Sequence, residues 1–348
     1  MRILVTGGAG YVGSVSVEAL VDAGHTVVVL DDCSTGHASA VPAGVLYLRE
    51  DCTDEAATAA ALRDQRIDAI LHCAARSLVG ESIRDPARYY RQNVAGGIAL
   101  LEAARAANVR RFVFSSTAAV YGIPETTPIA EDAPLRPINP YGETKRTFEA
   151  ALGWYGRAYG FRAVSLRYFN VAGATETNGE DHDPETHLIP AILRAAATSS
   201  ELTMYGDDYP TPDGTPIRDY IDVRDLADAH VLALEATGAD GAAGTGGARG
   251  ASEVGAGADL LVFNLGTGDG FSVREVIAAA EQVVGRPIAI RVGPRREGDP
   301  AVLVANAGRA RATLGWRPRH LDLEAMIGSA WAWRQRHPNG YGDRTAGQ

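Results

Sequence analysis

A glycine-rich turn near the N-terminus limits the possible folds of this chain more than any other feature. The apolar run Ile3–Val5 leads into the turn at Gly7–Gly13, whose sequence satisfies both a GxxGxxG and a GxGxxG spacing. Such glycines allow a tight turn and let the backbone approach a pyrophosphate at a helix N-terminus, where free N–H groups attract anions. The turn therefore predicts a strand, a phosphate-binding loop and a helix, in that order.

An acidic residue stands where a dinucleotide-binding turn requires one. Asp31 ends the β-rich segment 26–31 and lies 18 residues after Gly13. A carboxylate at this place can accept hydrogen bonds from both ribose hydroxyls and repels a 2′-phosphate. Because strand, turn, helix and acid occur together, the motif predicts NAD rather than NADP.

The first half of the chain alternates between β-rich and helical segments, which predicts an α/β fold with a Rossmann-like, doubly wound parallel sheet. The β-rich segments are 2–6, 26–31, 45–49, 68–73, 111–116 and 163–168. The apolar spacing within 88–108 predicts a helix, and a second helix is expected to run from Tyr141 to about Tyr159.

The alternation fades beyond residue 170, which suggests two domains. We expect an NAD-binding domain over 1–170 and a smaller C-terminal α/β lobe, mainly substrate-binding, over 171–348. The boundary is approximate and allows later strands and helices to return to the first domain. Residues 238–259 hold eight Gly and seven Ala, too little side-chain area to offset the entropy of ordering, so a flexible insert is predicted there.

Charge and residue usage exclude several classes of partner. The net charge of −10 opposes binding to nucleic acid, and no apolar run reaches the length of a membrane helix. Three cysteines without CxxC spacing favour a reducing cytoplasm over a disulfide framework. His182 and His187 are separated by a non-helical Asp-Pro-Glu-Thr with no third ligand indicated, so no metal site is predicted.

A tyrosine and a lysine four residues apart form the candidate catalytic pair. Tyr141 and Lys145 project from one face of the expected helix. A phenol has a pKa of about 10, so a phenolate near neutral pH needs positive charge beside it, here from the ammonium and an oxidised nicotinamide. Thr117 follows the fifth strand, where its hydroxyl can position a substrate oxygen whose proton Tyr141 removes.

With these motifs the chain resembles the extended short-chain dehydrogenase/reductase family, and within it the 4-epimerases of UDP-sugars. Besides the turn and the YxxxK unit, the resemblance is carried by stretches spread over nearly the whole sequence. These stretches are 79–82, 167–170, 209–215, 218–221, 225–227, 295–299 and 331–333. The resemblance implies an isomerase that interconverts UDP-glucose and UDP-galactose through a 4-keto intermediate with tightly bound NAD, acting as a homodimer.

The resemblance also implies binding residues, position by position. It places around NAD the residues Tyr11, Val12, Asp31, Asp51, Cys52, Ala74, Asn93 and Phe169. We expect further cofactor contacts from Gly7, Gly10, Gly13, Asp32 and Lys145. Around the nucleotide sugar it places Asn170, Leu188, Tyr205, Arg218, Arg296 and Asp299, together with Thr117 and Tyr141 at the reacting oxygen. The two arginines suit a diphosphate, which guanidinium groups bind bidentately.

Several positions depart from the family pattern and leave alternatives open. Ser77 stands where some relatives carry lysine, and His187 replaces an asparagine but can still donate one hydrogen bond. In the family, the residue at the position of Leu303 gates bulky C2 substituents. UDP-N-acetylglucosamine therefore remains an alternative substrate, as do UDP-xylose and UDP-glucuronate. A dehydratase or decarboxylase is disfavoured because Ala118 and Ala119 stand where those relatives carry an acid. A non-catalytic NAD sensor is disfavoured because the Tyr/Lys pair is present.

Overall fold

The computed structural model describes residues 1–238, 260–296 and 298–343. Its main sheet has seven parallel strands in the order β10-β6-β5-β4-β1-β2-β3. They are β1 (Arg2–Thr6), β2 (Thr26–Leu30), β3 (Leu46–Leu48), β4 (Ala69–His72), β5 (Arg111–Thr117), β6 (Arg162–Tyr168) and β10 (Leu260–Leu265). This confirms the predicted doubly wound parallel sheet.

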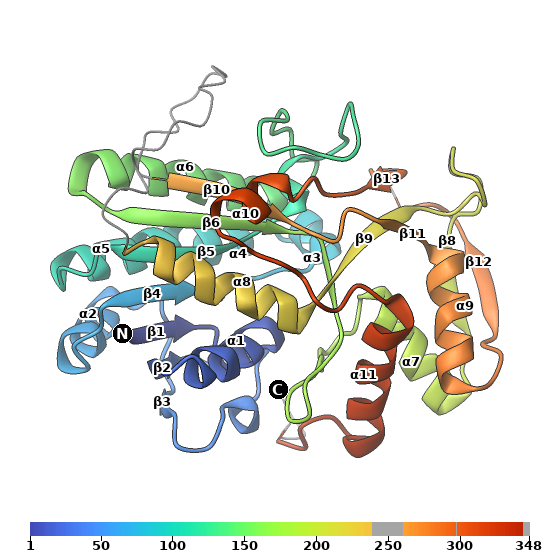
Figure 1. The fold of residues 1–348 in the computed structure, drawn as a ribbon, viewed down its shortest axis with the longest axis horizontal. Coiled ribbons are helices and arrows are strands. Elements are labelled where there is room, and N and C mark those ends of the chain that lie inside the picture. The colour runs from blue at the N-terminus through green and yellow to red at the C-terminus, as the bar shows by residue number, and fades with distance from the viewer. Residues whose placement is uncertain (239–259, 297, 344–348) are drawn as a thin grey trace.

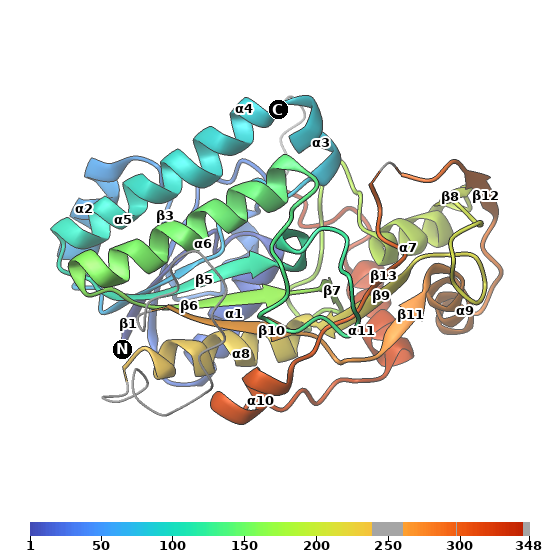
Figure 2. The ribbon, with the colours of Figure 1, turned by 90° about the horizontal axis from the view of Figure 1, so that it is seen from above.

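Helices cover both faces of this sheet, as Figures 1 and 2 show. On one face α1 (Tyr11–Asp22) and α8 (Val223–Ala236) bury apolar side chains such as Leu20 and Leu226 against the strands. On the other face α2 (Glu55–Asp64), α5 (Gly97–Ala106) and α6 (Pro140–Tyr159) bury residues such as Leu101 and Phe148. Because both faces are covered, the central strands contain apolar runs such as residues 3–5 of β1 and 69–71 of β4.

The expected helix over 88–108 is present but is not uniform. It consists of α4 (Pro86–Tyr89), a π-helical stretch η2 (Tyr90–Gly96) and α5, preceded by α3 (Val79–Arg84). The π-helical turn contains Asn93, whose side chain is buried and donates to the carbonyl of Arg76 at 2.9 Å. Single π turns of this kind often occur at functional sites.

A smaller lobe packs beside the carboxyl ends of the main strands (Figure 2). Its strands are β7 (Asn170–Ala172), β8 (Leu202–Tyr205), β9 (Ile217–Asp222), β11 (Gly270–Ser272), β12 (Ile290–Gly293) and β13 (Val302–Leu303). Its helices are α7 (Leu188–Thr198), α9 (Val273–Val284) and α11 (Leu323–Arg336), and α10 (Gly308–Thr313) packs near β10. A separate core that includes Ile192, Ile277 and Met326 holds α7, α9 and α11 together.

Elements beyond residue 170 also belong to the layers of the main sheet, among them α8 and β10. The predicted flexible insert at 238–259 lies outside the described residues except for Gly238, which is in a turn. Among the described residues, no helix is both long and apolar enough to cross a membrane.

Candidate active site

A cleft of about 410 Å³ opens at the carboxyl ends of the main strands. Segments that follow β1, β2, β4, β5 and β6 line it, as expected for ligand binding in an open α/β sheet. All the expected cofactor residues line this cleft: Gly7, Gly10, Tyr11, Val12, Gly13, Asp31, Asp32, Asp51, Cys52, Ala74, Asn93, Lys145 and Phe169. Of the expected substrate residues, the cleft includes Thr117, Tyr141, Asn170, His187, Leu188 and Leu303.

The glycine-rich turn is packed too closely for side chains. A Cβ on Gly13 would lie 2.0 Å from the carbonyl oxygen of Gly7, and one on Gly7 would lie 2.4 Å from the backbone nitrogen of Ala74. Gly10 caps α1 without any side-chain hydrogen bond, so the first N–H groups of the helix have no side-chain acceptor. This arrangement fits a pyrophosphate, which would supply that acceptor.

The Asp31 carboxylate is buried at the end of β2 and lines the same cleft. It accepts hydrogen bonds from the backbone N–H groups of Ala9 at 3.0 Å and Cys33 at 2.8 Å. Burial raises the pKa of its carboxyl, and these two donors oppose the rise. A carboxylate has about four acceptor sites, so Asp31 keeps acceptor capacity for the two hydroxyls of a ribose.

Tyr141 stands in the first turn of α6 with its ring buried at the floor of the cleft. Asn139 caps this helix by accepting from Gly142 N–H at 2.9 Å, which fixes where the helix begins. Burial raises the pKa of the Tyr141 phenol to about 12, although a hydrogen bond with Thr117 opposes the rise. The protein alone therefore favours the neutral phenol, and a further positive charge is needed to favour the phenolate.

Lys145 lies one turn further along α6, with its ammonium 6.0 Å from the centre of the Tyr141 ring. Nζ donates to the carbonyl oxygen of Ser115 at 2.8 Å, which anchors the lysine to β5 rather than to the phenol. Burial lowers the pKa of Lys145 to about 8, while Cys73 and Glu149 act in the opposite direction. The amine thus changes charge within a pH range in which the effect of that charge on Tyr141 can be measured.

A buried ion pair beneath the site was not identified from the sequence. Glu149 on α6 pairs with Arg167 on β6 at 2.6 Å, and both side chains are 5% exposed. The Glu149 carboxylate also accepts from the hydroxyls of Ser116 at 2.6 Å and Ser165 at 2.7 Å. These contacts hold α6 to the ends of β5 and β6, the elements that carry Tyr141 and Thr117. The sequence did not predict this pair, because an arginine in a strand and a glutamate on a helix form no pattern that indicates a contact between them.

Four of the expected substrate residues lie outside the lining of the cleft and form a neighbouring cluster: Tyr205, Arg218, Arg296 and Asp299. Arg218 pairs with Asp299 at 2.5 Å, and the Arg296 guanidinium stacks over the Tyr205 ring at 4.3 Å. Leu303 on β13 pairs in register with Arg218 on β9, so the cluster adjoins the cleft.

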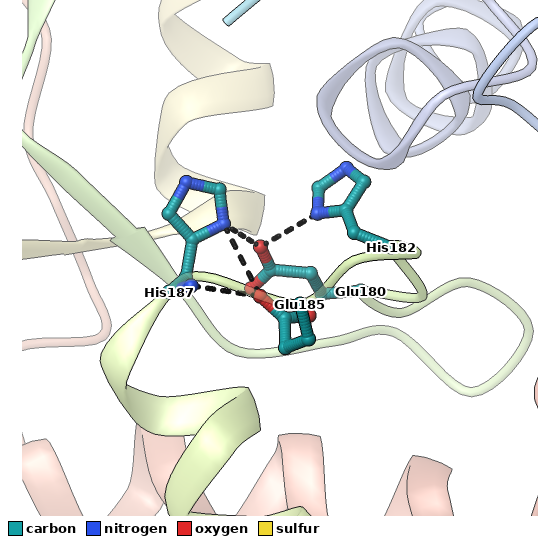
Figure 3. Close-up of side chains that lie close together, drawn as sticks. All are labelled: Glu180, His182, Glu185 and His187. Carbon is teal, nitrogen blue, oxygen red and sulfur yellow. Dashed lines mark hydrogen bonds and ion pairs between the residues drawn. The ribbon is translucent and has the colours of Figure 1, made fainter. Parts of the chain in front are cut away.

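The segment between β7 and α7 brings four potential metal ligands together, as Figure 3 shows. They are Glu180, His182, Glu185 and His187, and Glu180, His182 and His187 line the cleft. The expectation that the two histidines have no third candidate ligand is wrong, because the segment folds back and places both glutamates beside them. The charge of Glu180 raises the pKa of His187 to about 9. The sequence signal was present in Glu-Asp-His-Asp-Pro-Glu-Thr-His, but only the loop conformation brings these side chains together.

Comparisons with known proteins identify the family. Residues 3–244 match the NAD dependent epimerase/dehydratase family. UDP-glucose 4-epimerase of Streptomyces lividans is 50% identical over 99% of this chain and 99% of its own length. A crystal structure of UDP-glucose 4-epimerase from Brucella ovis in complex with NAD has a TM-score of 0.87 at 44% identity, covering 95% of this chain and 97% of that one.

A second solved structure contains a nucleotide as well as a cofactor. It is UDP-glucose 4-epimerase from Bifidobacterium longum in complex with NAD+ and UDP, with a TM-score of 0.87 at 35% identity over 98% of this chain and 100% of that one. The stretch that matches the family, residues 3–244, contains the turn, Asp31, Thr117, Tyr141 and Lys145. The chain therefore belongs to the NAD dependent epimerase/dehydratase family.

Proposed function

We propose that this protein interconverts UDP-glucose and UDP-galactose by inverting the configuration at C4, with NAD bound throughout turnover. One observation carries the proposal: Thr117, Tyr141 and Lys145 lie in the same cleft as the glycine-rich turn and Asp31. Full-length identity of 50% to a UDP-glucose 4-epimerase supports this choice of substrate pair.

The proposed chemistry begins with proton removal by Tyr141. The phenolate takes the proton of the sugar 4-hydroxyl, which Thr117 holds in place, and the C4 hydrogen leaves as hydride to give a 4-keto sugar. Bound in this cleft, oxidised NAD supplies the acceptor for that hydride and the positive charge that favours the phenolate. After the sugar turns over, hydride return to the opposite face of C4 and proton return from Tyr141 give the epimer.

The residues of the smaller lobe have a different role in this proposal. Arg218 and Arg296 would hold the diphosphate, supported by their position beside the cleft and by the guanidinium fit to phosphate. Asn170, His187 and Leu188 would contact the nucleotide sugar from β7 and the start of α7. Residues 1–170 would thus mainly bind NAD, and residues 171–348 would mainly bind the substrate.

The test is product analysis without added cofactor. Purified protein is incubated with UDP-galactose, and the nucleotide sugars are separated by chromatography while absorbance at 340 nm is followed. We expect UDP-glucose to approach its equilibrium share with no net release of reduced cofactor. A dehydrated product, or one molecule of reduced NAD per molecule of substrate, would contradict the proposal. Parallel reactions with UDP-N-acetylglucosamine, UDP-xylose and UDP-glucuronate define the accepted sugars.

We also infer that the enzyme is a cytoplasmic homodimer. The three free cysteines fit a reducing compartment. Ile83 on α3, Tyr90 on η2 and Trp154 on α6 expose 57%, 42% and 56% of their surface, which suits contact with a second copy. Light scattering coupled to size-exclusion chromatography should give twice the mass of one chain, and a monomer would reject the dimer.

A further inference from the structure

We propose that Glu180, His182, Glu185 and His187, drawn in Figure 3, bind one divalent transition-metal ion. Three of the four line the cleft. The four side chains come from one segment of eight residues between β7 and α7. They offer two imidazole nitrogens and two carboxylates, a donor set that holds zinc and related ions in proteins. This site goes beyond the epimerase function, because no step proposed for Tyr141 uses a metal.

The distances between the donor atoms suit a shared ion. One ligand atom from each residue lies within 4.8 Å of all the others. Bonds of about 2.1 Å in a tetrahedral site place neighbouring ligand atoms roughly 3.4 Å apart. Here Nδ1 of His182 lies 3.1 Å from Glu180, and Nδ1 of His187 lies 3.7 Å from Glu185 and 2.5 Å from Glu180. Of these three distances, the last must change most, lengthening by about 1 Å to admit an ion.

Burial and charge also suit a cation at this place. The Glu180 and Glu185 side chains are 7% and 6% exposed, and two neighbouring buried carboxylates need compensating positive charge. A divalent ion balances both carboxylates. His182 and His187 are 25% and 46% exposed and line the cleft, so an ion can reach the site from solvent.

The nitrogen donors select the class of ion. Mg²⁺ and Ca²⁺ prefer shells made entirely of oxygen, whereas imidazole favours zinc, iron, nickel and similar ions. Cysteine does not take part, because Cys33, Cys52 and Cys73 are not members of the cluster. Zn²⁺ is therefore the appropriate probe, with Co²⁺ as a spectroscopic substitute.

Surrounding contacts hold the ligand-bearing segment in its conformation. The backbone N–H of Gly179 donates to the Tyr341 hydroxyl at 3.1 Å, and Nε2 of His37 contacts the carbonyl oxygen of Asp181 at 3.0 Å. At the other end, His187 is the N-cap of α7, and its N–H donates to Glu185 at 2.8 Å. These contacts fix the backbone on either side of the four ligand residues.

Direct metal binding by the full-length protein tests the proposal. The protein is stripped with a chelator, dialysed against micromolar Zn²⁺ and analysed for bound zinc, and its affinity is measured by calorimetry against a competing chelator. We expect one zinc per chain, and X-ray absorption should show a shell of nitrogen and oxygen at about 2.0–2.1 Å. Less than stoichiometric zinc, or sulfur in the shell, would overturn the proposal.

Matched variants locate the site. His182→Gln and Glu180→Gln should each weaken zinc binding by about 100-fold or more, because each removes a direct ligand. His25→Gln is the control, since His25 lies beside the N-terminal amine at 3.4 Å, far along the chain from the cluster. If Glu180→Gln does not fold, the zinc affinity of His182→Gln alone tests whether the cluster binds the ion. Unchanged zinc affinity in His182→Gln, or loss of zinc in His25→Gln, would show that the cluster is not the site. None of these measurements depends on epimerase activity.

Discussion

At the scale of single residues, the environment of Tyr141 shows why a reactive group needs its neighbours. Burial raises the pKa of the phenol to about 12, above the ordinary value of 10. The Thr117 hydroxyl opposes this rise, and the Lys145 ammonium, 6.0 Å from the centre of the ring, places positive charge nearby. Burial lowers the pKa of Lys145 to about 8, so its charge is present at neutral pH and lost above it.

Lys145→Met should move the pH profile of kcat/KM. The active phenolate forms as pH rises through the pKa of Tyr141, and removing the ammonium raises that pKa. The acidic limb should therefore shift to higher pH by about one unit, with activity at pH 7 falling about tenfold. The measurement is a pH–rate profile. The control is Arg146→Met, since Arg146 is next to Lys145 in the sequence but its side chain is 41% exposed. A profile unchanged by Lys145→Met would remove the lysine from this role.

Tyr141→Phe should reduce kcat by at least about 100-fold, because it removes the acid/base group and keeps the ring. NAD content and UDP binding should remain close to wild type, as measured by absorbance and calorimetry. Tyr159→Phe, at the end of the same helix and 47% exposed, should have full activity. Turnover at the wild-type rate in Tyr141→Phe would place the base elsewhere.

At the scale of secondary-structure elements, close contacts fix how helices meet strands. The glycine-rich turn joins β1 to α1 without side chains, and the pair Glu149–Arg167 joins α6 to β6. Both contacts determine where residues of the cleft lie, although neither residue of the ion pair reaches the cleft lining.

Gly13→Ala should weaken NAD binding more than tenfold. Its Cβ would lie 2.0 Å from the Gly7 carbonyl oxygen, so the turn must shift away from the position that suits a pyrophosphate. Calorimetry with the cofactor-free protein gives the affinity. Gly328→Ala in α11, where a Cβ meets nothing within 4 Å, should leave NAD affinity unchanged. Equal affinities for both variants would contradict this account of the turn.

Arg167→Met should lower the free energy of unfolding by about 3–5 kcal/mol, since it leaves the Glu149 carboxylate buried without its cation. Chemical denaturation measures the change. The double variant Glu149→Gln/Arg167→Met should lose less than the sum of the two single losses, because the unpaired charge is gone. Additive losses would show that the two residues do not act as a pair.

At the scale of the whole molecule, residues 341–343 contact the loop that follows β2. Nδ1 of His37 contacts Asp343 at 2.7 Å, and its ring stacks on Tyr341 at 4.7 Å. His37 follows Gly36, which packs against the backbone of Ala9 in the glycine-rich turn. The C-terminal residues thus hold the loop that lines the cofactor end of the cleft.

Asp343→Ala should speed NAD dissociation about tenfold, equivalent to roughly 1.4 kcal/mol, because His37 loses a charge-assisted partner. Stopped-flow displacement of bound NAD measures the rate. Asp22→Asn, an exposed acid at the end of α1, is the control. If both variants release NAD at the wild-type rate, the C-terminal segment has no part in holding the cofactor.

Much of the fold was predictable because it depends on local patterns. Buried parallel strands require apolar runs, so β1 to β6 were found within one or two residues, and the glycine spacing identified the turn before α1. The YxxxK spacing placed Tyr141 and Lys145 on one helix face. The π-helical turn at Tyr90–Gly96 was not predicted, because one extra residue in a helix leaves the apolar spacing nearly unchanged.

Sequence by itself determined the first six strands of the main sheet, the glycine-rich turn and the placement of Tyr141 and Lys145 on one helix face, because each depends on residues close together along the chain. Only the tertiary structure decided that Lys145 is anchored to Ser115, that Glu149 pairs with Arg167, and that two glutamates meet His182 and His187. Those contacts join separate elements or depend on how a loop folds back. The physical reason is that burial and distance in space set the charge and the partners of a side chain, and neither can be read from spacing along the chain.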